Sequence, residues 1–77
     1  MGAKAIPRAF GNILRECRIK AELSQEELAL KADLDRTYIS LLERGLRQPT
    51  LETIFRLAEV LDIAPATLVG RTASEIQ

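Results

Sequence analysis

The chain has 77 residues and no His, and its 11 Lys and Arg balance 11 Asp and Glu, so the formal net charge is zero. This length supports one domain at most, and the only cysteine, Cys17, has neither a second cysteine for a disulfide nor a His for a conventional zinc site. Without His there is no His-based acid–base catalysis, so we expect a binding protein without a cofactor rather than an enzyme. No apolar run reaches the roughly 20 residues that cross a bilayer, so we expect a cytoplasmic protein with no membrane partner.

The composition favours helices over strands. Leu contributes 12 residues and Ala 10, whereas Val and Ile together contribute 9, and four Gly with three Pro give little turn chemistry for a sheet. We predict an all-α domain of five helices over residues 7–70, with a flexible N-terminal tail at 1–6 and a C-terminal tail at 71–77.

The first helix is predicted to begin near Pro7, a residue that suits the first turn, and to run to about Ala21. Phe10, Leu14, Cys17 and Ala21 recur at intervals of three and four residues, so that they form one buried stripe. On this stripe Cys17 is interpreted as a small buried hydrophobe, and a redox sensor is the alternative.

A second helix is predicted to follow Ser24, which forms a capping box with Glu27, and to end near Ala32. Its inward residues are Leu28 and Ala29. Because Ala29 is small, it allows a neighbouring helix to cross closely.

A third helix is predicted to begin at Arg36, with Asp35 as its N-cap, and to end at Gly45, the residue that takes the left-handed conformation. Only residues 33–35 separate it from the second helix, and two short helices joined so tightly are typical of a helix-turn-helix. The residues expected to face the core here are Leu34, Ile39 and Leu42.

After a loop at 46–49, Thr50 is predicted to cap a fourth helix, and a fifth begins at Pro65 and stops at Gly70. The apolar stripe expected on the fourth helix consists of Leu51, Ile54, Ala58 and Leu61.

The outward face of the third helix carries chemistry suited to DNA. Since Ile39 and Leu42 point inward, the opposite face holds Arg36, Thr37, Ser40, Leu41 and Arg44. Arg fits guanine through two hydrogen bonds, Ser and Thr fit a base edge or a phosphate, and Leu packs on a thymine methyl group. A solvated helix face is the alternative, but such a face has no need of an apolar Leu41.

The run LSQEELALKADLDRTYISLLERGLRQPTLETIFRLAEVLDI resembles the lambda-repressor-like (Xre/Cro type) DNA-binding domain, and the match extends from about Phe10 to Gly70. Within that family, LDRTYIS followed by ERG resembles the controller proteins of restriction–modification systems. The resemblance implies a sequence-specific transcriptional regulator that binds palindromic operators in the major groove of double-stranded DNA as a homodimer. A controller would regulate its own gene and an endonuclease gene, with RNA polymerase as a further partner, on the bacterial nucleoid.

The resemblance also implies roles for individual residues. The base-reading residues would be Arg36, Thr37, Ser40 and Leu41. The phosphate-binding residues would be Gln25, Tyr38, Arg44, Arg47, Gln48 and Thr50. Three of these have plainer alternatives, since Gln25 could be an exposed capping-box residue, Tyr38 a cover for the helix start and Arg47 a solvated loop charge. Arg18 and Glu43 would form a scaffold salt bridge between the first and third helices.

Three positions depart from the family pattern. Asp33 stands where Gly is usual, and tolerates a left-handed backbone less well than Gly but better than most residues. Glu22 also replaces a frequent Gly, so the first helix is expected to run further or to end without a left-handed cap. Leu46 replaces a frequent Arg or Lys, which removes one expected phosphate contact.

The dimer surface is expected on the C-terminal third, because the chain has no separate oligomerisation segment. Its predicted residues are Phe55, Leu57, Ile63, Leu68 and Val69. The alternative is that these residues only complete the core of one chain. A different function is also open, that of an antitoxin-type, prophage or orphan repressor whose C-terminal surface binds a partner protein.

The zero net charge conceals an uneven distribution. Residues 1–20 hold five basic residues and one acidic residue, and residues 36–50 hold three basic and one acidic. The other two segments are acidic: residues 21–35 hold five acidic residues and one basic residue, and residues 51–77 hold four acidic and two basic. Local potential governs the binding of a charged ligand, so neutrality of the whole chain does not exclude DNA.

Overall fold

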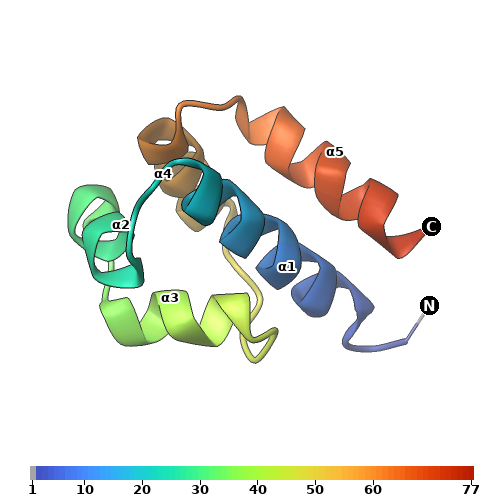
Figure 1. Cartoon of the computed structure of the whole chain (residues 1–77). Coiled ribbons are helices and arrows are strands. Elements are labelled where there is room, and N and C mark those ends of the chain that lie inside the picture. Colours follow the sequence, from blue (N-terminus) through green and yellow to red (C-terminus); the bar gives the residue numbers. More distant parts are fainter. Residues whose placement is uncertain (1) are drawn as a thin grey trace.

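The computed structural model describes residues 2–77 and contains, within them, five helices and no strand. The helices are α1 (Ala5–Lys20), α2 (Gln25–Ala32), α3 (Arg36–Glu43), α4 (Leu51–Leu61) and α5 (Pro65–Ile76). α1 lies between α5 on one side and α3 on the other, and the start of α1 and the end of α5 lie at the same end of the molecule (Figure 1). The all-α prediction is confirmed.

Three helices begin at the predicted caps. The Ser24 hydroxyl accepts a hydrogen bond from the Glu27 N–H (3.0 Å), and the Glu27 carboxylate accepts one from the Ser24 N–H (2.8 Å). The Asp35 carboxylate accepts from the Thr37 N–H at 2.7 Å, and the Thr50 hydroxyl accepts from the Thr53 N–H at 3.1 Å. These bonds satisfy amide groups that have no partner inside the helix.

Left-handed residues end several helices. Asp33 (φ 57°) and Gly45 (φ 74°) take this conformation as predicted. The expectation for Glu22 was wrong, since it also takes a left-handed conformation (φ 60°), and the Leu23 N–H donates to the Arg18 carbonyl oxygen at 3.2 Å. α1 therefore ends at Lys20 and is followed by a left-handed C-terminal hydrogen-bonding pattern, although the left-handed residue is Glu22 and not a glycine.

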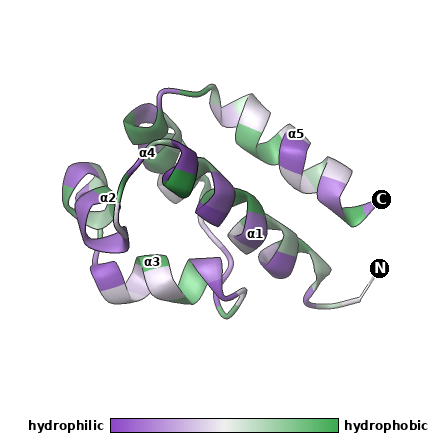
Figure 2. Cartoon of the chain, in the orientation of Figure 1, coloured by the Kyte–Doolittle hydropathy of each residue, from purple (hydrophilic) through white to green (hydrophobic). Residues whose placement is uncertain are grey.

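Every helix contributes residues to the core, and each helix carries both hydrophobic and hydrophilic residues (Figure 2). The largest fully buried side chains are Leu14, Leu28, Ile39, Leu42, Leu57 and Leu68. Two residues assigned to apolar stripes lie outside it. Ala21 is exposed because α1 has already ended, and Leu51 is 70% exposed because the first turn of α4 extends past the core.

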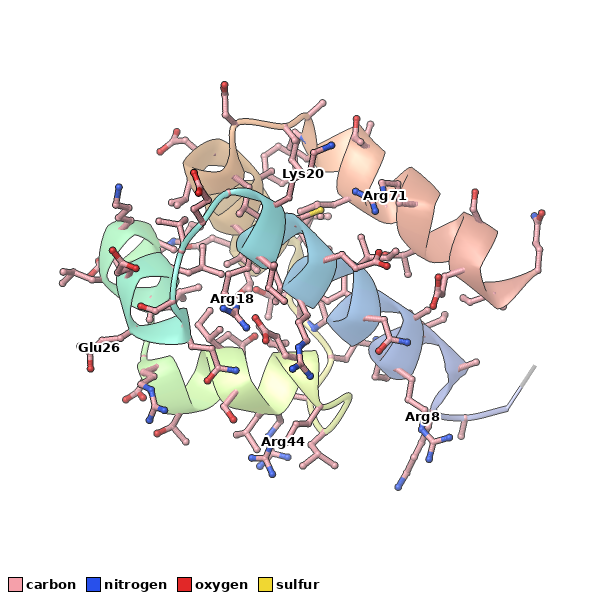
Figure 3. The ribbon with its side chains drawn as sticks, viewed as in Figure 1. Arg8, Arg18, Lys20, Glu26, Arg44 and Arg71 are labelled. Atoms are coloured by element: carbon pink, nitrogen blue, oxygen red, sulfur yellow. The ribbon has the colours of Figure 1, made fainter. Side chains whose placement is uncertain are left out.

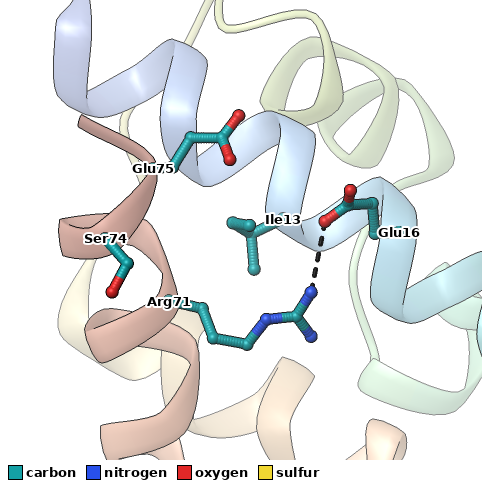
Figure 4. Close-up of a pocket in the computed structure, with 5 residues that line it drawn as sticks. All are labelled: Ile13, Glu16, Arg71, Ser74 and Glu75. Carbon is teal, nitrogen blue, oxygen red and sulfur yellow. Dashed lines mark hydrogen bonds and ion pairs between the residues drawn. The ribbon is translucent and has the colours of Figure 1, made fainter. Parts of the chain in front are cut away.

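Both ends of the predicted domain require correction. α1 begins at Ala5 rather than Pro7, and Pro7 fits inside the first turn because its missing N–H would have no helical partner there. α5 does not stop at Gly70 but continues to Ile76, so residues 71–76 are helix and not tail. The extra turns pack on α1, where Thr72 is buried and Arg71 bonds to Glu16 at 3.2 Å beside a shallow pocket of about 240 Å3 (Figure 4).

Within residues 2–77, no helix is both long enough and apolar enough to cross a membrane.

Candidate nucleic-acid interface

α3 presents the predicted face to solvent. Ile39 and Leu42 are fully buried and so fix the rotation of the helix about its axis. On the other side Arg36 and Thr37 are exposed at the N-terminal end of the helix. The remaining members of the predicted face are Ser40 and Leu41, which are half-buried, and Arg44, which is exposed.

The backbones of α1 and α3 meet at Gly11. A Cβ atom at this position would lie 2.4 Å from the Leu42 carbonyl oxygen and 2.7 Å from that of Glu43. Only glycine fits here, because backbone atoms on both sides cannot yield to a side chain. This contact fixes the distance of α3 from the rest of the domain, and the sequence analysis missed it.

A buried ion pair fixes the same crossing. Arg18 Nε donates to Glu43 Oε2 at 2.6 Å, Nη2 donates to Oε1 at 3.0 Å, and Nη1 donates to the Leu23 carbonyl oxygen at 2.9 Å. The two side chains are 13% and 3% exposed, and Figure 3 shows Arg18 between α1 and α3. Hydrogen bonding to Glu43 raises the pKa of Arg18 above its ordinary value, so the guanidinium is charged at every working pH. The expected ion pair is therefore present.

Gln25 joins this network from the start of α2. Its side-chain amide donates to Glu43 Oε1 at 3.1 Å, and the side chain is half-buried. Since a primary amide has two hydrogens, one remains for an acceptor outside the protein. Gln25 is thus more than an exposed capping-box residue: it links α2 to the end of α3.

Tyr38 and Thr50, two of the residues expected to bind phosphate, have hydroxyl groups that form hydrogen bonds within the protein. The Tyr38 hydroxyl lies 3.3 Å from Thr53 Oγ1, and the Thr50 hydroxyl donates to the same atom at 3.0 Å. Tyr38 is half-buried against the core. Both residues tie α3 and the following loop to α4, which is the covering role left open for Tyr38.

The loop after α3 carries exposed donors. Arg44 Nε donates to the Ser40 carbonyl oxygen at 3.4 Å, and Arg47 Nη1 donates to the Leu46 carbonyl oxygen at 2.9 Å. Gln48 is exposed beside them. Within residues 2–77 the ion pairs belong to Arg18, Arg56 and Arg71, so neither loop arginine has an acidic partner.

The predicted dimer residues divide into two groups. Leu57 and Leu68 are fully buried in a single chain, so their assignment to a surface was wrong. Ile63 is partly buried against the core, whereas Phe55 and Val69 are 55% and 50% exposed. The sequence analysis also missed exposed Leu51, four residues before Phe55 and therefore on the same face of α4.

Among the described residues, no group of His, Cys, Asp and Glu side chains is arranged to hold a metal ion. The thiol of Cys17 is buried and accepts a hydrogen bond from Arg71 Nη1 at 3.1 Å, as a packed core residue at the contact of α1 with α5.

Comparison with known proteins agrees with this geometry. The family described as "Helix-turn-helix" (HTH_3) matches residues 14–68. Control protein C.BamHI of Bacillus amyloliquefaciens is 42% identical over 64 residues, which cover 82% of this chain and 79% of that protein. The crystal structure of the restriction–modification controller protein C.AhdI from Aeromonas hydrophila superimposes with a TM-score of 0.78 at 47% identity, covering 80% of this chain and 94% of that one. The C.Esp1396I controller tetramer in complex with its natural 35-base-pair operator gives a TM-score of 0.81 at 28% identity, with 92% and 93% covered.

Proposed function

The chain belongs to the helix-turn-helix family HTH_3, and from this premise we propose that it is a transcriptional regulator that binds DNA sequence-specifically through the outer face of α3. The similar proteins include Control protein C.BamHI and the restriction–modification controller protein C.AhdI. We propose that this chain is such a controller and that it regulates its own gene and an endonuclease gene, on nucleoid DNA in the cytoplasm.

The observation that carries the proposal is the placement of Arg36 and Thr37. Both are exposed at the N-terminal end of α3, and the buried residues of this helix hold it at one rotation. In helix-turn-helix proteins the N-terminal residues of the recognition helix contact base edges in the major groove. The proposed base-reading set is Arg36, Thr37, Ser40 and Leu41.

Phosphate contacts are proposed for the donors around this face. Arg44, Arg47 and Gln48 have donor groups available in the loop after α3, and Gln25 has one free amide hydrogen at the start of α2. Tyr38 and Thr50 are assigned instead to holding the loop on α4, since their hydroxyls are engaged with Thr53.

We propose that the protein binds as a homodimer through exposed apolar residues of α4 and α5. The tetrameric controller on its operator supports an oligomer on DNA, and an isologous dimer would place two copies of α3 about 34 Å apart on a palindrome. The proposed contact residues are Leu51, Phe55, Ile63 and Val69. RNA polymerase would be a further partner if the protein activates transcription, and a repressor or antitoxin with a heterologous partner on this surface is the second candidate.

The test is selection of bound sequences from a random DNA library, with the wild type and with Arg36→Ala. The wild type should enrich a palindrome. Arg36→Ala should lose preference at one position of each half-site, at about 1–3 kcal/mol per contact, because its guanidinium no longer matches a base edge. Equal weakening on all sequences would show that Arg36 is a phosphate anchor and not a base reader.

A further inference from the structure

A cleft of about 360 Å3 lies where α1 passes the end of α3. It is lined by Arg8, Asn12 and Arg15 of α1 and by Glu43 and Arg44. In Figure 3, Arg8 and Arg44 both extend on the side of the molecule where α3 lies. None of the roles assigned above uses Arg8, Asn12 or Arg15.

The charge of this cleft is strongly positive. Among residues 2–77, none of its three arginines forms an ion pair. Its one carboxylate, Glu43, is 3% exposed and already accepts hydrogen bonds from Arg18 and Gln25. Glu43 is therefore neutralised from inside the fold. A second carboxylate, Glu75 of α5, accepts a hydrogen bond from Asn12 Nδ2 at 3.3 Å but forms no ion pair with the three arginines that line the cleft.

Arg8 of α1 lies in close contact with Gly45, the residue after Arg44. Gly45 has φ +74°, and a Cβ atom there would lie 3.0 Å from Arg8 Cγ and 3.1 Å from Arg8 Cα. Arg8 thus packs directly against the residue that follows Arg44. Arg8 and Arg44 therefore line one cleft, and both positive charges would attract an anion bound there.

The cleft also lies at a useful distance from the base-reading residues. Arg44 is eight residues after Arg36, which corresponds to about 12 Å along α3 at 1.5 Å per residue. The major groove is about 12 Å wide. If the N-terminal end of α3 reads bases, its other end reaches the sugar-phosphate backbone that borders the groove.

We infer that Arg8, Asn12, Arg15 and Arg44 form a phosphate-binding cleft, and that the phosphate belongs to the DNA backbone flanking the bases read by α3. The source of the phosphate rests on the proposed function. Phosphate oxygens accept hydrogen bonds from guanidinium groups well. The Asn12 amide gives one hydrogen to Glu75 Oε2 and has a second one for a phosphate.

The first experiment compares the salt dependence of binding to a selected operator. The variant Arg8→Gln/Arg15→Gln should lower the slope of log affinity against log salt by about 1, with the preferred base sequence unchanged, because one phosphate contact is lost. The matched control is Lys20→Gln/Lys31→Gln, which removes the same charge from exposed positions outside the cleft and should keep the wild-type slope.

The position of the phosphate follows from duplexes that carry one neutral methylphosphonate at successive flanking positions. One position should weaken the wild type but not the Arg8→Gln/Arg15→Gln variant, since that contact is already absent. A wild-type slope in the cleft variant, or an equal loss in the lysine control, overturns the assignment to DNA.

The second experiment requires no DNA. Inorganic phosphate titrated into the free protein should shift the NMR signals of the Nε–H groups of Arg8, Arg15 and Arg44 more than those of Arg56 and Arg71. Equal shifts at all five overturn the cleft. If the wild type enriches no DNA sequence, the proposed function fails while this titration still decides the cleft. Selective shifts without an effect on DNA binding would assign the cleft to a free phosphate compound and overturn its DNA source.

Discussion

The side of the domain formed by α3 and the side formed by α4 and α5 differ in the pairing of their charged residues and in the exposure of their apolar residues. Arg36, Arg44 and Arg47 on the α3 side have no acidic partner within residues 2–77. On the other side Arg56 bonds to Glu52 at 2.6 Å, while apolar residues such as Phe55 are left exposed. Unpaired cations suit a polyanion and exposed apolar residues suit another protein, so the two sides are suited to different partners.

This difference explains how a chain of zero net charge binds DNA. Glu52 of α4 neutralises Arg56 of the same helix, and the buried Glu43 neutralises Arg18. The remaining positive charge is concentrated around α3. The whole-chain total averages over this arrangement and predicts nothing about it.

The largest expected effect comes from breaking the ion pair under the α3 side. Glu43→Ala would leave the guanidinium of Arg18 buried without a counter-charge, and should lower the free energy of unfolding by about 3 kcal/mol or more in a denaturant titration. The double variant Arg18→Met/Glu43→Leu removes both charges and should recover most of this loss. A double variant as unstable as Glu43→Ala would contradict the view that the unpaired charge is what costs stability.

Gly11→Ala should lower the free energy of unfolding by about 1–3 kcal/mol, because its Cβ would meet two backbone carbonyl groups of α3. Gly70→Ala is the matched control, since nothing lies within 4 Å of a Cβ at that helical position. It should be neutral or slightly stabilising. Thermal unfolding followed by circular dichroism measures both, and equal stability of the two variants would contradict the close crossing.

The proposed dimer contact on the α4 and α5 side is tested by substituting charged residues for its exposed apolar residues. Phe55→Lys/Val69→Lys should weaken self-association by tenfold or more, about 1.4 kcal/mol, because ammonium groups would be buried in an apolar contact. Sedimentation equilibrium at tens of micromolar should then report the 8.6 kDa chain alone, whereas the wild type should be heavier. A wild type that is also monomeric under these conditions would remove the dimer from the account.

The smallest effect concerns the cap of α2, which positions Gln25. Hydrogen bonding to the Ser24 N–H lowers the pKa of Glu27 below its ordinary value of 4.5. A carboxylate whose pKa is lower in the folded state stabilises folding above the unfolded pKa, and this contribution is lost as the pH falls through the folded value. Glu27→Gln should therefore be slightly less stable than the wild type at neutral pH, and the difference should close in acid. A difference independent of pH would assign it to something other than ionisation.

Local features of the fold were predictable from the sequence because they depend on neighbouring residues. Ser24, Asp35 and Thr50 cap the helices that follow them, and Ile39 with Leu42 sets the outward face of α3. Periodicity shows that a residue is apolar and shares a face, but not whether its own chain or a second copy covers it. For that reason Leu57 and Leu68 were assigned to a surface although they lie in the core.

Other features depend on contacts between residues distant in sequence. Gly11 is required by a backbone that lies 31 residues further along the chain, at Leu42, and no local pattern marks it. The continuation of α5 past Gly70 depends on packing against α1, which outweighs the low helix propensity of glycine. The cluster of Arg8, Arg15 and Arg44 likewise forms only when α1 passes the end of α3.

The central claim is that the outer face of α3 reads base sequence. It is tested most directly by the affinity of the wild type for its selected palindrome relative to a scrambled duplex of the same length and composition, at one fixed salt concentration. The account predicts tighter binding to the palindrome by a factor of about 1,000 or more. A ratio close to one would show that the arginines only hold the DNA backbone, and would contradict sequence-specific recognition by α3.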